Sequence, residues 1–480
     1  MSLAKKTITG IIWGFCEQVL RRGVSLITTL LLAYFLVPED YGLLGMMAVF
    51  IAVAKSLMES GFLQALIRLE ELYPVDLNTA FFANLALGSI AYMLLFFTAP
   101  LVAGFYDEVR LVELMRVAGL IVLINSAQTI QVAIFHRNMD FKAQFKAGLP
   151  ASLLSSITAV ILAYYGLGVW ALIVQMLTAA LITTIILWGM SEWRPQWNVS
   201  GKSLSDMYGF GYKLFLSGLL DTVFRNLYVV VIAKLFAVSV AGLYFFAEKI
   251  KELLLRQLVG AVQNATYPAL ASIQNDDARL KAAYKRIVSI TTFVVFPVLM
   301  IFSALAQPLF EFLLPSKWWS AVPYLQLLCI SGLFYPLHAI NLNILKVKGR
   351  SDLFLYLEVV KKVITILIIF VSYRYGIIGI LLGQIFSSVL NYIPNSYFSE
   401  KLIKYSVREQ LLDFLPSLVL SLIVGGLIYG FTLLSKWSDF VQLLVLSILG
   451  VAIYFLSAHI LNLKAYCITR EVIITKIKFK

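Results

Sequence analysis

Apolar residues occur along this chain in long unbroken runs, and polar residues gather in the short segments between them. A helix needs about 20 consecutive, mostly apolar residues to cross the hydrocarbon core of a bilayer. Fourteen runs come close to this length, so the pattern predicts an all-α integral membrane protein with fourteen transmembrane helices. The expected spans are residues 10–36, 41–65, 79–105, 112–135, 145–165, 168–190, 211–236, 240–268, 287–306, 322–345, 354–373, 376–398, 411–434 and 440–461.

The basic residues between the runs predict the orientation. With the N-terminus inside, 26 of the 39 Lys and Arg residues fall on inner connectors, Lys361 and Lys362 being counted there, and nine fall in or near the spans. The outer connectors carry the other four, which are Arg110, Lys317, Arg374 and Lys436. Because cytoplasmic loops carry an excess of Lys and Arg, we expect both termini in the cytoplasm.

Composition agrees with a membrane protein. The chain is 60% hydrophobic and 14% charged, whereas soluble domains are about one quarter charged. Lys5 and Lys6 precede the first run without a cleavage-site pattern, so we expect the first helix to be retained. The net charge of +13 is spread over many connectors, and we therefore expect no nucleic-acid partner. Three scattered cysteines predict neither a disulfide framework nor zinc, and we expect no cofactor.

Two sequence echoes indicate an internal repeat. "LVPEDYGLLGMMAV" from Leu36 matches "FAVSVAGLYFFAEK" from Phe236 at an offset of 200, with Gly42 and Gly242 in the same place. "AYYGLGVWALIVQ" likewise resembles "YRYGIIGILLGQ" at an offset of 210. Spans 1–6 therefore recur as spans 7–12, and an even number of spans makes the repeat parallel. We expect domains at 1–200, 201–405 and 406–480, the last with two further spans and a basic tail.

Charged residues inside the spans concentrate in equivalent places of the two copies. Acid and base lie four residues apart, on one helical face, in Glu17/Arg21, Lys55/Glu59, Asp221/Arg225 and Glu252/Arg256. The other ten spans carry almost no charge, apart from Arg116 near an outer end and the isolated His338 and His459. Lys234 lies near an outer end, where we expect it to snorkel.

These charges allow two interpretations. In the first, each pair neutralises itself and holds helices together. In the second, the first and second spans of both halves face a shared, hydrated, cationic cavity in which guanidinium groups clamp phosphate oxygens. The candidate phosphate-binding residues are then Arg21, Arg22, Lys55, Arg225, Arg256 and Lys249. The candidate ion-coupling carboxylates are Glu17, Glu59, Asp221 and Glu248, because carboxylates inside a membrane often carry protons or ions.

Longer motifs resemble a known family. "LLLAYFLVPEDYGLLGMMAVFIAVAKSLMESGFLQALIR", "RNMDFKAQFKAGLPASLLSS" and "YLQLLCISGLFYPLHAINLNILKVKGRSDLFLYLEVVKK" look like Wzx-type oligosaccharide flippases. These belong to the polysaccharide transporter branch of the multidrug/oligosaccharidyl-lipid/polysaccharide (MOP) superfamily. The resemblance covers nearly the whole chain, and it is closest to the colanic-acid-exporter and teichuronic-acid-type subgroup.

The resemblance implies a fold and a function. The fold would be two six-helix bundles in a V, related by a parallel pseudo-two-fold axis, plus two C-terminal helices. The protein would flip undecaprenyl-diphosphate-linked oligosaccharide across the bacterial inner membrane for O-antigen, capsule or exopolysaccharide synthesis, by alternating access coupled to H⁺ or Na⁺. Polysaccharide polymerase machinery is an implied associate. Related flippases have cavity-facing arginines on spans 1, 2 and 8. Arg21, Arg22 and Arg256 fit this pattern, but span 2 has Lys55, which lacks the guanidinium fork.

Two alternatives remain open at this stage. A cation-coupled drug exporter of the same superfamily would need an acidic or aromatic pocket, and the basic bias argues against it. A membrane enzyme acting on lipid-linked sugars would need catalytic carboxylates in a larger external domain. The outer connectors are too short for such a domain, so we expect no enzymatic activity.

Overall fold

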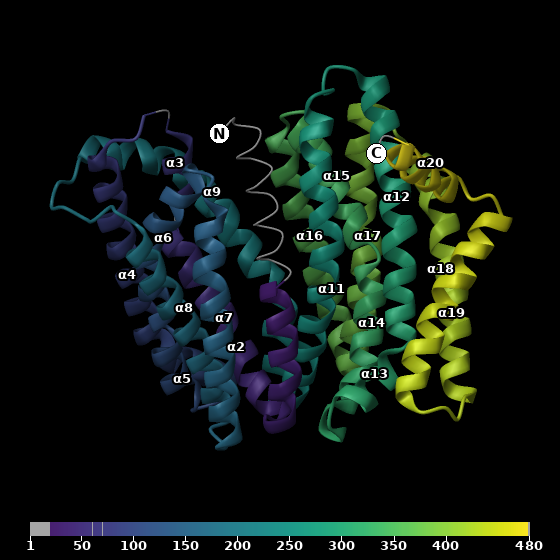
Figure 1. Ribbon diagram of the computed structural model, residues 1–480, viewed down its shortest axis with the longest axis horizontal. Coiled ribbons are helices and arrows are strands. Elements are labelled where there is room, and N and C mark those ends of the chain that lie inside the picture. Colours follow the sequence, from purple (N-terminus) through teal and green to yellow (C-terminus); the bar gives the residue numbers. More distant parts are fainter. Residues whose placement is uncertain (1–19, 60, 70, 479–480) are drawn as a thin grey trace. The chain divides into compact units, whose positions relative to one another are not determined.

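The chain folds into helices. The computed structural model describes residues 20–59, 61–69 and 71–478, and among these residues it contains helices and connecting segments but no strand (Figure 1). Two compact units divide the chain into Met1–Phe245 and Phe246–Lys480. The helix α11 (Val238–Ala271) runs across this division.

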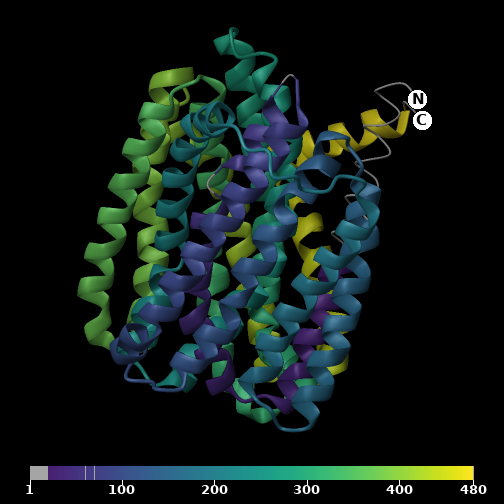
Figure 2. The same cartoon turned by 90° about the vertical axis from the view of Figure 1, so that its left-hand side faces the viewer.

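The first unit contains a helix over residues 20–35 followed by a series of long helices. α7 packs along α8, and α4 packs along both α6 and α2. Figure 2 shows the long helices of this unit, coloured purple to blue. The bounds are α2 (Pro38–Glu59), α3 (Phe62–Arg68), α4 (Pro74–Tyr106), α5 (Leu111–Ala118), α6 (Leu120–Arg137), α7 (Phe141–Tyr164), α8 (Val169–Met190), α9 (Gly201–Arg225) and α10 (Leu227–Leu235).

The second unit continues from α11. α12 packs along α18, and α16 packs along α17. The basic tail forms a helix, α20, which packs against α12. The bounds are α12 (Asp277–Ala304), α13 (Ala306–Leu313), η1 (Ser316–Ala321), α14 (Val322–Gly332), α15 (Tyr335–Val347), α16 (Ser351–Ser372), η2 (Tyr373–Tyr375), α17 (Gly376–Ile403), α18 (Val407–Leu434), α19 (Asp439–Ile460) and α20 (Lys464–Lys478).

Short polar residues set the starts of several helices. An N-cap oxygen satisfies backbone N–H groups that have no partner within the helix. Asp140 Oδ1 accepts a hydrogen bond from Ala143 N at 3.0 Å, and Asp276 Oδ1 accepts one from Arg279 N at 3.0 Å. Ser406 caps α18 in the same way. These caps therefore fix where α7, α12 and α18 begin.

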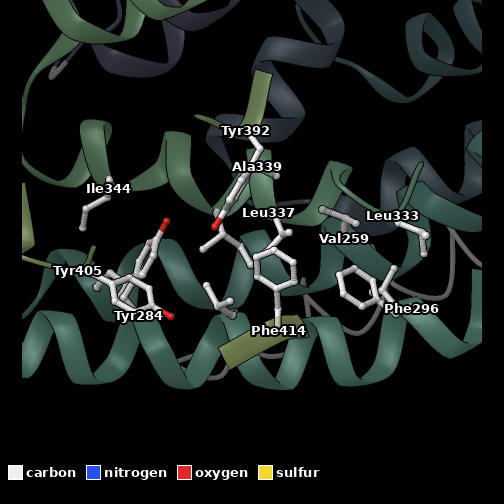
Figure 3. Close-up of a cluster of buried hydrophobic side chains, with 14 of the residues drawn as sticks. Val259, Tyr284, Phe296, Leu333, Leu337, Ala339, Ile344, Tyr392, Tyr405 and Phe414 are labelled. Atoms are coloured by element: carbon white, nitrogen blue, oxygen red, sulfur yellow. The ribbon is translucent and has the colours of Figure 1, made fainter. Parts of the chain in front are cut away.

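Aromatic residues fill the interior of the second unit. The rings of Tyr284, Tyr392, Tyr405 and Phe414 gather between α12, α15, α17 and α18 (Figure 3). Each phenol is satisfied by a polar atom, as buried tyrosines require. Tyr392 donates a hydrogen bond to the Gln410 side chain at 2.6 Å. This core therefore mixes apolar packing with hydrogen bonds that cross between helices.

Ten segments among the described residues are long and apolar enough to span a membrane. The expected count of fourteen is higher for three physical reasons. α9 and α11 carry many charges, which lower their hydropathy. The first expected span falls partly outside the described residues. α16 and α17 merge into one segment, Tyr356–Ile403. The protein is thus an all-helical, multi-pass membrane protein, and the number of fourteen stays a prediction.

Helix positions recur at the spacing of the sequence echoes. α2 begins at Pro38 and α11 at Val238, and α7 begins at Phe141 and α16 at Ser351. The fourth expected span is broken between α5 and α6. The tenth expected span, its counterpart in the second copy, is likewise broken between α14 and α15. The compact units do not divide the chain at residue 200, because α9 packs against α2. The domain limits read from the repeat therefore stay a prediction.

Candidate functional site

Arg225 lies at a break inside the seventh expected span. It is the last residue of α9, and Asn226 separates α9 from α10 while donating a hydrogen bond to Thr222 O at 2.7 Å. Arg225 forms an ion pair with Asp221, one turn earlier, and their side chains are 59% and 51% exposed. The negative end of a helix dipole favours a cation in this position. The sequence predicted the pair but not the break, because residues 211–236 were expected to form one continuous span.

Lys55 and Glu59 form a looser pair at the end of α2. Lys55 Nζ lies 4.0 Å from Glu59 Oε1, and both side chains are 49% exposed. At this separation the pair adds little stability. Both groups therefore remain available to another charged partner.

The charges of α11 differ from this arrangement. Lys251 Nζ binds Glu248 at 2.7 Å, and both side chains are largely buried, 8% and 22% exposed. This contact favours a structural role for Glu248, which the sequence suggested as an ion-coupling residue. Lys249 is half-buried, and the Arg256 side chain lies outside the described residues.

The first expected span places its two arginines on the helix over residues 20–35. Arg21 is exposed and Arg22 is half-buried. Glu17, their expected acidic partner, lies outside the described residues. The ion pairs described for Lys55, Arg225 and Lys251 each join two residues of one helix. Convergence of the predicted residues on one cavity stays a prediction.

Lys234 has a specific partner. Its Nζ binds Asp107 Oδ2 at 2.9 Å and lies 5.5 Å from the centre of the Phe105 ring. The contact joins the end of α10 to the residue that follows α4. Lys234 was expected to snorkel at the outer end, and the structure adds this ion pair, which the sequence could not indicate across 127 positions.

The arrangement offers anion-binding chemistry. Charged side chains within spanning helices face protein or water in nearly all membrane proteins, and the half-exposed Arg225 and Lys55 fit that rule only if water reaches them. Among the residues that the structure describes, no three His, Cys, Asp or Glu side chains are placed to hold a metal ion. The exposed guanidinium of Arg225 is the anion-binding group whose position in the candidate site the structure describes best.

Comparison with family models assigns the sequence to a family. The model of the family described as "Polysaccharide biosynthesis protein" matches residues 31–323. The chain belongs to this polysaccharide biosynthesis protein family. Its members include Wzx-type flippases, which are membrane transporters and not enzymes.

Individual relatives support this membership. The chain is 25% identical to the lipopolysaccharide biosynthesis protein WzxC of Escherichia coli K12, over 90% of each chain. It is 21% identical to the teichuronic acid biosynthesis protein TuaB of Bacillus subtilis 168, over 88% of each chain. These relatives place this family member in a bacterial membrane and in transport for polysaccharide synthesis.

Solved structures show the fold. The lipid II flippase MurJ, in an inward closed conformation, aligns with a TM-score of 0.76 at 15% identity, covering 94% of this chain and 99% of that one. An inward-facing multidrug transporter of the MATE family, within the MOP superfamily, aligns with a TM-score of 0.62 at 18% identity, covering 82% and 100%. This polysaccharide biosynthesis protein therefore has a MOP-like fold.

One group of charges in this family member was misplaced by the sequence analysis. Lys361 and Lys362 were counted on an inner connector, but they lie in the middle of α16 together with Glu358. Glu358 forms ion pairs with Lys361 and, at 3.4 Å, with Lys362, and the three side chains are 12% to 23% exposed. The signal was present in the sequence, since spacings of three and four residues inside an apolar run place the charges on one helical face.

Proposed function

We propose that this chain flips undecaprenyl-diphosphate-linked oligosaccharide from the cytoplasmic to the outer leaflet of the bacterial inner membrane, by alternating access. The observation that carries the proposal is Arg225, a half-exposed guanidinium at a helix break within the seventh expected span. Broken helices mark the substrate sites of many transporters. WzxC and TuaB, named for lipopolysaccharide and teichuronic acid synthesis, and MurJ, named as a lipid II flippase, support it.

The proposed architecture has fourteen spans with both termini in the cytoplasm. Residues 1–200 and 201–405 form the two six-helix bundles, in a V, and residues 406–480 add two spans and the basic α20. The recurrence of helix starts at offsets of 200 and 210 residues supports this division. It also places the proposed binding residues on corresponding helices of the two bundles, although at an offset of 200 Arg21 matches Asp221 and not Arg225.

The diphosphate is the part of the substrate that the basic residues recognise. A guanidinium donates two parallel hydrogen bonds to phosphate oxygens, and it stays charged at all relevant pH values. In this mechanism Arg21, Arg22, Arg225 and Arg256 hold the diphosphate, and Lys55 and Lys249 add positive charge. The sugar occupies the hydrated space beside them.

The polyprenyl tail remains in lipid along α18 and α19. A groove of about 440 Å³ in the second unit supports a lipid-facing role for α18. Its lining includes Leu422, Gly425, Gly426 and Tyr429 of α18, with Met300 of α12 opposite. Gly426 leaves space that a branched alkyl chain would fill, since nothing lies within 4 Å of an added Cβ, whereas Gly425 packs against Met300.

An H⁺ or Na⁺ gradient drives the cycle in this proposal. The candidate ion-coupling carboxylates are Glu17, Glu59, Asp221 and Glu248. Asp221 and Glu59 are the better placed of these, because their side chains are about half exposed while each contacts a cation. Binding of the substrate diphosphate to Arg225 or Lys55 would free the partner carboxylate to accept an ion.

The test is export in cells that lack the chromosomal copy of this protein. Arg225→Ala and Arg21→Ala should abolish surface polysaccharide at normal protein level, and Arg225→Lys should retain part of it. Arg374→Ala is the matched control, because Arg374 is an exposed residue of η2. Normal export by Arg225→Ala would show that the phosphate-binding assignment is wrong.

A further inference from the structure

The second unit contains a stripe of buried polar residues along α17. Ser387, Asn391, Asn395 and Ser399 recur at four-residue spacing, so they share one helical face, and all but the half-buried Asn391 are buried. Ser387 and Asn391 bind Thr365 of α16, at 3.0 and 3.3 Å. Ser399 donates to Asn341 of α15 at 2.6 Å, which also accepts from Tyr284 of α12. The stripe extends over about 18 Å of helix.

His338 of α15 lies in the middle of this stripe. Its Nε2 is 3.1 Å from the backbone carbonyl oxygen of Ser388, and a carbonyl can only accept a hydrogen bond. Nε2 therefore carries a hydrogen. Its Nδ1 is 2.8 Å from Asn395 Nδ2, which donates to it. The ring is thus held as the neutral tautomer with Nδ1 unprotonated.

Asn395 is arranged so that it can serve a second charge state of His338. The residue is 1% exposed, and its Oδ1 is buried without a hydrogen-bond partner among the described residues. A buried acceptor left without a donor costs about 1–3 kcal/mol. Rotating the amide by 180° would exchange the two atoms and turn Oδ1 toward Nδ1. That arrangement pairs Oδ1 with Nδ1 only when Nδ1 has bound a proton, and it moves the Nδ2 group to the position that Oδ1 leaves.

Charged residues near His338 link a proton on its ring to the transport cycle. From α16, Lys361 acts electrostatically against a proton on His338 and Glu358 acts in its favour. From α17, the phenol ring of Tyr392 lies 6.4 Å away, centre to centre. Glu358 already binds Lys361 and Lys362. A proton on His338 adds a third cation near this carboxylate, so the hold of Glu358 on its lysines weakens. The lysines then become better partners for an anion.

We propose that His338 binds the coupling proton of this transporter, and that Asn395 senses its charge by reversing its amide. The proposal rests on the proposed flipping function and narrows its coupling ion to H⁺. Sequence reasoning passed over His338 because it stands alone in an apolar run. Its hydrogen-bond partners, Ser388 and Asn395, belong to α17 and lie 50 and 57 positions away in the sequence.

Proton binding can be measured without the lipid substrate. The chain has three histidines, so ¹³C-histidine labelling of the purified protein gives three ring signals, which His338→Gln and His459→Gln assign. We expect the His338 signal to shift with pH as Nδ1 binds a proton. Asn395→Asp places a carboxylate beside Nδ1, and it should tighten proton binding at His338 at least tenfold while leaving His459 unchanged. A His338 signal that does not titrate, or that ignores Asn395→Asp, overturns the proposal.

Coupling is measured in liposomes that contain fluorescent undecaprenyl-diphosphate-linked oligosaccharide, without Na⁺. A pH gradient should accelerate flipping several-fold for the wild type and for His459→Gln, but not for His338→Gln. Equal acceleration of His338→Gln would overturn the role of His338. Wild-type flipping that ignores the pH gradient would overturn the proton proposal and leave the flipping function intact, whereas absence of any flipping would contradict the flipping function itself.

Discussion

Gly42 and Gly242 occupy the same place in the two copies of the repeat, and in the structure they pack against each other. A Cβ atom on Gly242 would lie 1.7 Å from Pro38 O and 2.9 Å from Gly42 N. A Cβ atom on Gly42 would lie 2.1 Å from Val238 O. No side chain fits at either position, so the starts of α2 and α11 touch through their backbones.

This contact predicts a strong and local effect of one methyl group. Gly242→Ala should lower the melting temperature in detergent, because inserting a carbon into a filled space costs roughly 1–3 kcal/mol. Gly104→Ala, in α4, is the matched control, since nothing lies within 4 Å of its added Cβ. It should leave stability unchanged or raise it slightly, because alanine favours helix over glycine. Tryptophan fluorescence measures the melting temperature. Equal melting temperatures for Gly242→Ala and Gly104→Ala would contradict the close approach of the α2 and α11 backbones.

The Lys234–Asp107 ion pair predicts coupling between α10 and α4. Lys234→Gln and Asp107→Asn should each lower stability, and the double variant should lose less than the sum, because one interaction is counted twice. We expect a coupling energy of roughly 0.2–1 kcal/mol, as for exposed ion pairs. Thermal unfolding of the four proteins measures it. Strict additivity would show that Lys234 only extends toward solvent.

The connector between α4 and α5 predicts a dependence on pH. Arg110 binds both carboxylate oxygens of Glu108, at 2.8 and 2.7 Å, and these hydrogen bonds hold the pKa of Glu108 below its ordinary value. The pair therefore stabilises the fold above the unfolded pKa of about 4.3, and this stabilisation is lost as the pH falls through the lower folded value. Arg110→Gln should melt slightly earlier than wild type at pH 7 and together with it near pH 3. A difference that persists at low pH would exclude this linkage.

The sequence was sufficient to predict much of the helical architecture. Runs of about 20 apolar residues locate most long helices, because a membrane requires every backbone group to be bonded within the helix. The breaks beside Arg225 and between α14 and α15 were missed. Both breaks lie within runs that are long enough to be expected as single spans, and local contacts such as Asn226 to Thr222 satisfy the backbone beside Arg225.

The site was predicted less completely than the fold. Pairs four residues apart, such as Asp221 and Arg225, follow directly from helical geometry. Contacts between helices, such as His338 to Asn395 or Lys234 to Asp107, depend on how helices are placed around one another. A repeat of 3.6 residues fixes which face a residue occupies, but not which helix lies opposite.

Flipping of a labelled lipid by the purified chain tests the central claim most directly. Liposomes that contain fluorescent undecaprenyl-diphosphate-linked oligosaccharide report the outer-leaflet fraction when a quencher is added outside. The account predicts that wild type and Arg374→Ala move the lipid, and that Arg225→Ala is slowed about 10-fold or more, since a hydrogen bond to a charged group contributes roughly 1.5–3 kcal/mol. Lipid movement no faster than in protein-free liposomes, or an Arg225→Ala rate equal to that of wild type, would contradict it.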